Sequence, residues 1–213
     1  MSAKLTLKQS VGVVAAALGL VAAPQAMAEV VYDNSSNYLG NFSDLGNGTI
    51  GDQITLGGAS RVITEFKFEY FLSFAVSGNE KGALKFYAND GAGGLPSTML
   101  FDSGVFGLTS GFHTVTASDL SQSVANSFTW AVTFSGLEGS ERAGLLFYDA
   151  PTVGSSFDDF WANTSGAWQL MNTAGLKDNF AAQITAVPEP TTFALLGTGL
   201  VGLGLAAYRR RQS

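Results

Sequence analysis

Residues 61–76 read RVITEFKFEYFLSFAV, and this stretch sets the expected class of fold. Its even-numbered positions are largely apolar and its odd-numbered positions largely polar. The apolar set is Val62, Phe66, Phe68, Tyr70, Leu72, Phe74 and Val76, and the charged set is Arg61, Glu65, Lys67 and Glu69. Because successive side chains of a strand point to opposite faces, this period of two predicts a strand with one buried face. The sixteen residues exceed the usual length of a strand, so we expect a bend or bulge within it.

The same pattern recurs along the chain. In Asn126–Ser135, one face carries Phe128, Trp130, Val132 and Phe134. Shorter strands are expected at Gln53–Leu56, Ala83–Ala88, Met99–Phe106, His113–Ala117, Ala143–Tyr148, Ala167–Met171 and Phe180–Thr185. Clusters of Gly, Asn, Asp and Ser separate these runs, and residues 33–48 are expected to form a polar loop. The pattern predicts an all-β fold, an antiparallel β-sandwich of the jelly-roll-like type.

The charge balance bounds the class of partner. Residues 29–186 form one predicted domain, with six Lys or Arg against sixteen Asp or Glu, a formal charge near −10. Nucleic acid is excluded as a partner because its recognition needs a basic surface. The chain has no cysteine, so disulfides, thiolate metal sites and cysteine nucleophiles are excluded as well.

The N-terminus has the three parts of a secretory signal peptide. Lys4 and Lys8 supply a basic region, Val11–Ala23 supplies an apolar region, and Ala26-Met27-Ala28 ends with small residues where signal peptidase cleaves. Residues 1–28 are therefore predicted to be removed, with Glu29 as the first residue of the exported protein.

The C-terminus has a second three-part arrangement. Val187-Pro188-Glu189-Pro190 precedes an uncharged run at residues 191–208, and Arg209, Arg210 and Arg211 follow. Eighteen helical residues span about 27 Å, near the lower limit for crossing a bilayer. The arginines are expected to stay on the cytoplasmic side and stop transfer. The alternative, a buried helix of a soluble domain, fits poorly with three arginines at its end. We therefore predict a sorting and anchoring segment at residues 187–213, with a transmembrane helix at about residues 191–208.

A secretory signal together with Val187-Pro188-Glu189-Pro190, an apolar segment and a terminal arginine cluster resembles the PEP-CTERM sorting proteins of Gram-negative bacteria. The resemblance implies processing near the motif by an exosortase, a membrane-embedded enzyme. It also implies a link to exopolysaccharide or biofilm production. The expected location is the cell membrane first, then the cell surface or extracellular matrix after processing. The resemblance assigns no activity to residues 29–186.

Two loops carry candidate ligand-binding residues. Trp161 and Trp168 lie near Asp158 and Asp159, and aromatic rings beside carboxylates suit sugar rings; the alternative is that the rings cover the core. The Asp158–Asp159 pair and Asn89–Asp90 also supply oxygen ligands of the kind that calcium takes, although neither has the spacing of an EF-hand loop. Solvated loop carboxylates are the simpler interpretation of both pairs.

Signs of catalysis are sparse. His113 is the single histidine, and there is neither a Gly-x-Ser-x-Gly motif nor a phosphate-binding loop. We therefore expect a non-enzymatic, exported surface or matrix protein that requires no cofactor. The alternatives are a carbohydrate-binding module and, less favoured, a polysaccharide hydrolase.

Overall fold

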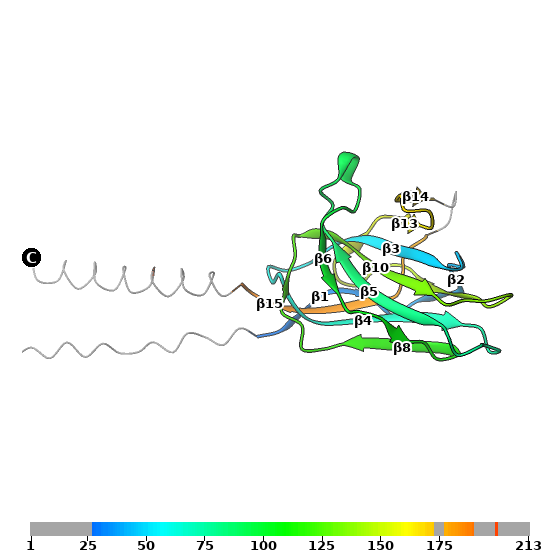
Figure 1. The fold of residues 1–213 in the computed structure, drawn as a ribbon. Coiled ribbons are helices and arrows are strands. Elements are labelled where there is room, and N and C mark those ends of the chain that lie inside the picture. Colours follow the sequence, from blue (N-terminus) through cyan, green and yellow to red (C-terminus); the bar gives the residue numbers. More distant parts are fainter. Residues whose placement is uncertain (1–26, 173–176, 190–198, 200–213) are drawn as a thin grey trace, which may run out of the picture.

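The computed structural model describes residues 27–172, 177–189 and residue 199. Within residues 27–172 and 177–189 the regular structure is β-strand, apart from one 3-10 turn, η1 (Ala92–Gly94). The strands form two antiparallel sheets that pack against each other (Figure 1). The prediction of an all-β fold with antiparallel sheets is confirmed, and the jelly-roll-like assignment stays a prediction.

The first sheet is built around one long strand. Its members are β1 (Glu29–Asn34), β2 (Tyr38–Phe42), β4 (Val62–Leu72), β8 (Gly111–Ala117), β9 (Gln122–Ser123), β11 (Ala143–Tyr148) and β15 (Ala182–Val187). One edge of β4 pairs with β8 and β9, and the other pairs with β15 and then with β11. Outside these, β1 pairs with β15 and β2 with β11. Because β4 is long, the strands that pair with it differ between its two ends.

The second sheet is centred on β3 (Gly48–Thr55) and β10 (Ser127–Ser135), which pair over eight residues of each strand. The other members are β5 (Lys81–Tyr87), β6 (Met99–Asp102), β7 (Phe106–Gly107), β12 (Ser155–Ser156), β13 (Phe160–Asn163) and β14 (Gln169–Met171). The loop that joins β5 to β6 contains η1 and projects away from the sandwich (Figure 1).

The core lies where the alternating patterns of β4 and β10 face each other. The ring of Phe66 on β4 lies 5.1 Å, centroid to centroid, from both Trp130 on β10 and Phe86 on β5. All the predicted inward residues of β10 are buried, as are Phe66, Phe68, Tyr70 and Leu72 of β4. Burial of these large side chains, at about 1.5–3 kcal/mol each, is the main stabilising contribution in a chain without disulfides.

Three expectations need correction. Residues 33–48 are not simply a loop, because they contain the end of β1 and all of β2. β2 was missed because it is an edge strand of mostly exposed residues, held by backbone pairing with β11 and not by an alternating pattern. Phe74 is 76% exposed, since β4 ends at Leu72 and Phe74 lies beyond the strand. The last strand also runs to Val187, one residue beyond the expected end of the domain.

Among the described residues, no helix has the length and apolar character needed to span a membrane. The predicted span at residues 191–208 lies outside the described residues, apart from Gly199. Pro190, Arg209, Arg210 and Arg211 lie outside them too, as does the predicted signal peptide up to residue 26.

Candidate functional site

The predicted sugar-binding aromatics lie against the outer face of the second sheet. Trp161 on β13 is 7% exposed, and its indole Nε1 donates to Gln53 Oε1 at 3.4 Å. Trp168 packs edge-on against Tyr87 of β5, with ring centroids 5.3 Å apart. The β13–β14 hairpin therefore uses both tryptophans as cover for the sheet, and Trp168 is the more accessible of the two.

The two neighbouring carboxylates, Asp158 and Asp159, lie in different environments. Asp158 forms an ion pair with Lys177, and this contact holds the pKa of Asp158 below its usual range. Partial burial raises the pKa of Asp159, and the nearby negative charges of Asp158 and Asp178 add to the effect. Opposed shifts of this kind occur in acid–base pairs, but here the lowered pKa comes from a salt bridge, which is equally a structural feature.

The candidate calcium ligands Asn89 and Asp90 fasten the projecting β5–β6 loop. Asp90 accepts hydrogen bonds from the Thr98 backbone N–H at 2.9 Å and from the Thr98 hydroxyl at 2.6 Å, and these bonds lower its pKa. Asn89 Oδ1 accepts from the Thr129 hydroxyl at 2.7 Å. In the part of the chain that the structure describes, no group of three or more acidic or histidine side chains is placed to hold a metal ion.

The single histidine, His113, contacts other residues of the domain through its imidazole ring. The imidazole of His113 stacks on Tyr70 with ring centroids 5.6 Å apart, and its Nε2 lies 2.9 Å from the carbonyl oxygen of Ser110.

A buried carboxylate was missed by the sequence reasoning. Asp52 points from β3 into the core and is fully buried. Its Oδ1 accepts from the Ser156 hydroxyl at 2.7 Å and its Oδ2 from the Phe180 N–H at 3.2 Å. Burial raises the pKa of Asp52 well above its usual value, against the opposing effect of these two hydrogen bonds. Its position between Ile50 and Ile54, both buried on the same face, is the signal that could have revealed it.

An exposed group of rings on the outer face of the first sheet was also missed. We call it the distal aromatic patch; it consists of Tyr38, Phe42, Phe71, Phe74 and Phe112. Phe71 is central, with ring centroids 4.7 Å from Phe42, 4.8 Å from Phe112 and 5.5 Å from Phe74. The ring centroids of Tyr38 and Phe112 are 6.4 Å apart. Phe71 sits at an odd position of β4, directly after the charged residues of that face, and this was the available signal.

A small second hydrophobic cluster supports the patch. It contains Leu146, Tyr148 and Ala181, and Phe42 and Phe71 pack against it. The Tyr148 hydroxyl donates to Glu69 Oε2 at 2.8 Å, and burial together with this bond raises the pKa of Tyr148 to about 12. Gly144 allows β2 to reach this face, because a Cβ atom there would overlap the carbonyl oxygen of Ser43.

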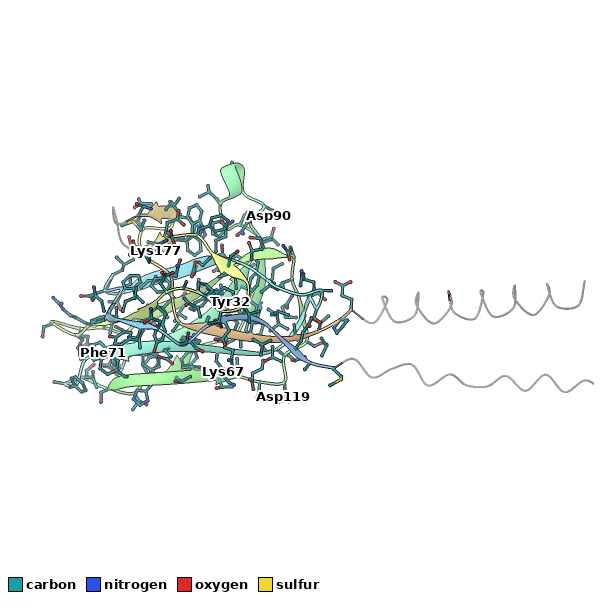
Figure 2. The ribbon with its side chains drawn as sticks, turned by 180° about the vertical axis from the view of Figure 1, so that it is seen from behind. Tyr32, Lys67, Phe71, Asp90, Asp119 and Lys177 are labelled. Carbon is teal, nitrogen blue, oxygen red and sulfur yellow. The ribbon has the colours of Figure 1, made fainter. Side chains whose placement is uncertain are left out.

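The N-terminal and C-terminal segments both leave the sandwich at the same end. Glu29, the predicted first residue of the exported protein, pairs with Ala186, and Val187 pairs with Val62 at the start of β4. Glu189 is exposed beyond the last strand. Figure 2 shows Phe71 at the opposite end of the molecule from Asp119 and from these chain ends. Phe71 lies nine positions after Val62 on β4, a distance of about 30 Å along a strand.

The comparisons with known proteins bear on the tail alone. Residues 186–211 match the family model of the PEP-CTERM protein-sorting motif, as the resemblance predicted. The motif implies export, processing by an exosortase and a membrane-anchored surface location. No curated protein and no solved structure matches the chain.

Proposed function

We propose that this chain is an exported protein that an exosortase-type enzyme processes, and that displays its β-sandwich first on the cytoplasmic membrane and then at the cell surface or in the matrix. The observation that carries the proposal is the sorting motif, which begins at residue 186, inside the last strand. The processing segment therefore starts where the folded domain ends, and a cleavage after Val187 would leave both sheets complete.

The tail has a physical basis for this role. Pro188 and Pro190 restrict the backbone and cannot donate hydrogen bonds, so the segment between domain and membrane stays extended and open to an active site. Arg209, Arg210 and Arg211 each cost about 2.5–3.5 kcal/mol to insert into a bilayer, so they stall the chain with Glu189 at the outer surface.

The domain itself is proposed to be non-catalytic and to work without a cofactor. Support comes from the roles of its candidate chemical groups: Asp158 pairs with Lys177, Asp90 fastens a loop through Thr98, and His113 contacts a backbone carbonyl. Calcium binding at Asn89 and Asp90 would compete with the bonds from Thr129 and Thr98. A hydrolase using Asp158 and Asp159 is the weaker alternative, and product release from a panel of polysaccharides would establish it.

A role in exopolysaccharide or biofilm formation is the finer part of the proposal. The excess of acidic residues disfavours nucleic acid as a partner and is compatible with an uncharged matrix component. Carbohydrate binding without turnover is the second candidate function, for which the exposed rings of the domain are the specific observation.

The test is mass spectrometry of the mature C-terminus in a host that carries an exosortase. The tail should be missing beyond the motif, while a variant with Pro188→Ala and Glu189→Ala should stay in the membrane fraction uncleaved. Replacing the three arginines with Gln should instead release unprocessed protein outward. An intact C-terminus through Ser213 in the natural chain would refute processing and leave a simple anchor.

A further inference from the structure

The distal aromatic patch leaves an unusual amount of apolar surface in water. Phe74 is 76% exposed, Phe112 55% and Tyr38 41%. Isolated exposed apolar residues need no explanation, but a contiguous cluster of rings marks a binding surface. Phe42 and Phe71 pack against the buried cluster, and Phe71 in turn contacts Phe74 and Phe112, so the centre of the patch is fixed before any partner arrives.

A shallow groove of about 100 Å³ continues the patch along the same face. Its lining combines hydroxyl, amide, ammonium and carboxylate groups, from Ser35, Thr114, Gln183, Lys67 and Glu69, with the apolar side chain of Ala181. Glu69 lies two positions before Phe71 on β4, and Thr114 two positions after Phe112 on β8, so each pair shares one face of its strand. Groove and patch therefore form one surface.

We propose that this surface binds a neutral, extended polysaccharide chain. A sugar ring has C–H faces that stack on aromatic rings, and hydroxyls that both donate and accept hydrogen bonds. The patch supplies the rings. Along the groove, Lys67 contacts Glu65 and Gln183, and Glu69 accepts from Tyr148; the remaining donor and acceptor capacity of these side chains is what the groove offers to a sugar. The proposal rests on the proposed function and names a binding site and partner class for it.

Two other partners fit less well. A membrane is disfavoured because the patch lies at the end of the molecule opposite the segment that leads to the anchor, about 30 Å along β4. A second protein copy is disfavoured because the centres of protein interfaces are depleted of charges, whereas Lys67 and Glu69 line this groove. The domain's charge near −10 argues for an uncharged polymer over a polyanion.

The test uses the chain from Glu29 to Ser213 in lipid nanodiscs, with affinity electrophoresis through gels that contain a polysaccharide. Hydroxyethylcellulose, xyloglucan, galactomannan and laminarin are the neutral probes, and alginate is the anionic probe. At least one neutral probe should retard the protein, and alginate should not. Phe112→Ala and Phe74→Ala should each weaken retardation about tenfold, because each removes one stacking ring. Phe112→Tyr should retain it.

Phe157→Ala is the matched control, since Phe157 is 48% exposed but lies outside the patch. Circular dichroism checks that each variant is folded. If Phe112→Ala does not fold, the result for Phe74→Ala decides the test, because the Phe74 ring lies outside the core. The proposal is overturned if no neutral probe binds, or if Phe157→Ala and the patch variants lose binding equally. It is also overturned if the patch variants instead abolish self-association in ultracentrifugation or adsorption to vesicles.

The outcome is separable from that of the proposed function. The nanodisc assay involves no exosortase, and the C-terminal mass measurement involves no polysaccharide. A processed chain that binds no probe would refute this binding site alone, and a probe-binding chain with an intact tail would refute the sorting proposal alone.

Discussion

Replacing Asp52 with Asn should stabilise the domain at neutral pH, and the gain should increase with pH. Asp52 is fully buried, and its two oxygens accept from Ser156 and from the Phe180 N–H. An Asn side chain can keep both contacts, with Oδ1 accepting from Phe180 and Nδ2 donating to Ser156 Oγ. The Ser156 hydroxyl can then turn toward the Phe157 carbonyl, 3.4 Å away. The substitution removes the group that titrates and keeps a partner for each polar atom of this set.

The magnitude follows from proton linkage. Burial raises the pKa of Asp52 in the folded state, whereas in the unfolded chain it lies near 3.9. Between these two values the folded state holds a proton that the unfolded state has lost. Stability from this site is therefore complete below the unfolded pKa and is lost as pH rises toward the folded pKa, by about 1.4 kcal/mol per pH unit. Asn carries no such proton, so the advantage of the variant should grow at that rate above about pH 4.

The assay is urea unfolding of residues 29–189 at several pH values, followed by tryptophan fluorescence. Subtracting the free energy of unfolding of the natural sequence from that of the variant removes the effects of all other acidic groups. Asp90→Asn is the control with the opposite sign: the Thr98 bonds lower the pKa of Asp90, so its contribution is present at neutral pH and is lost on acidification. A stability difference for Asp52→Asn that does not change with pH would refute the reasoning.

Three further predictions follow from the fold. Gly144→Ala should lower the free energy of unfolding by about 1–3 kcal/mol through overpacking against Ser43. Gly107→Ala, which has open space around it, is the control and should change the stability little. Thermal melts compare the two variants, and equal melting temperatures would contradict the prediction. Residues 29–189 should unfold cooperatively and give a β-type circular dichroism spectrum, and a helical or unfolded spectrum would refute the domain assignment. Calcium and magnesium at equal ionic strength should shift the melting temperature alike, since Asp90 is engaged with Thr98 and Asp158 with Lys177; a calcium-specific rise would instead establish a site.

The sequence predicted best what depends on local periodicity. The alternation in residues 61–76 located β4 and its buried face, and the expected strand at Ala143–Tyr148 has the bounds of β11. β1, β2, β9, β12 and β13 were missed because they have two to six residues, too few to establish a period; β2 is in addition largely exposed and is held by its pairing with β11. A strand without an apolar face carries no period to detect.

The candidate site was harder to predict because it joins distant segments. Tyr38, Phe71 and Phe112 come from three strands, and the pairing of β2 with β11, of β11 with β4 and of β4 with β8 brings them together. Trp161 and Trp168 are close in the sequence and looked like a site, yet they mainly cover a sheet. The patch therefore follows from pairing between strands and not from clustering along the chain.

The placement of β15 has a mechanical consequence. This strand is hydrogen-bonded on both sides, to β1 and to β4, and the sorting motif begins within it. A pull between the membrane anchor and a polymer held at the far end of β4 would act along the strands. The bonds that flank β15 would then be loaded together in shear, and not opened one at a time as in unzipping. A domain tethered in this way can transmit tension between the cell and its surrounding matrix without first unravelling at its attachment point.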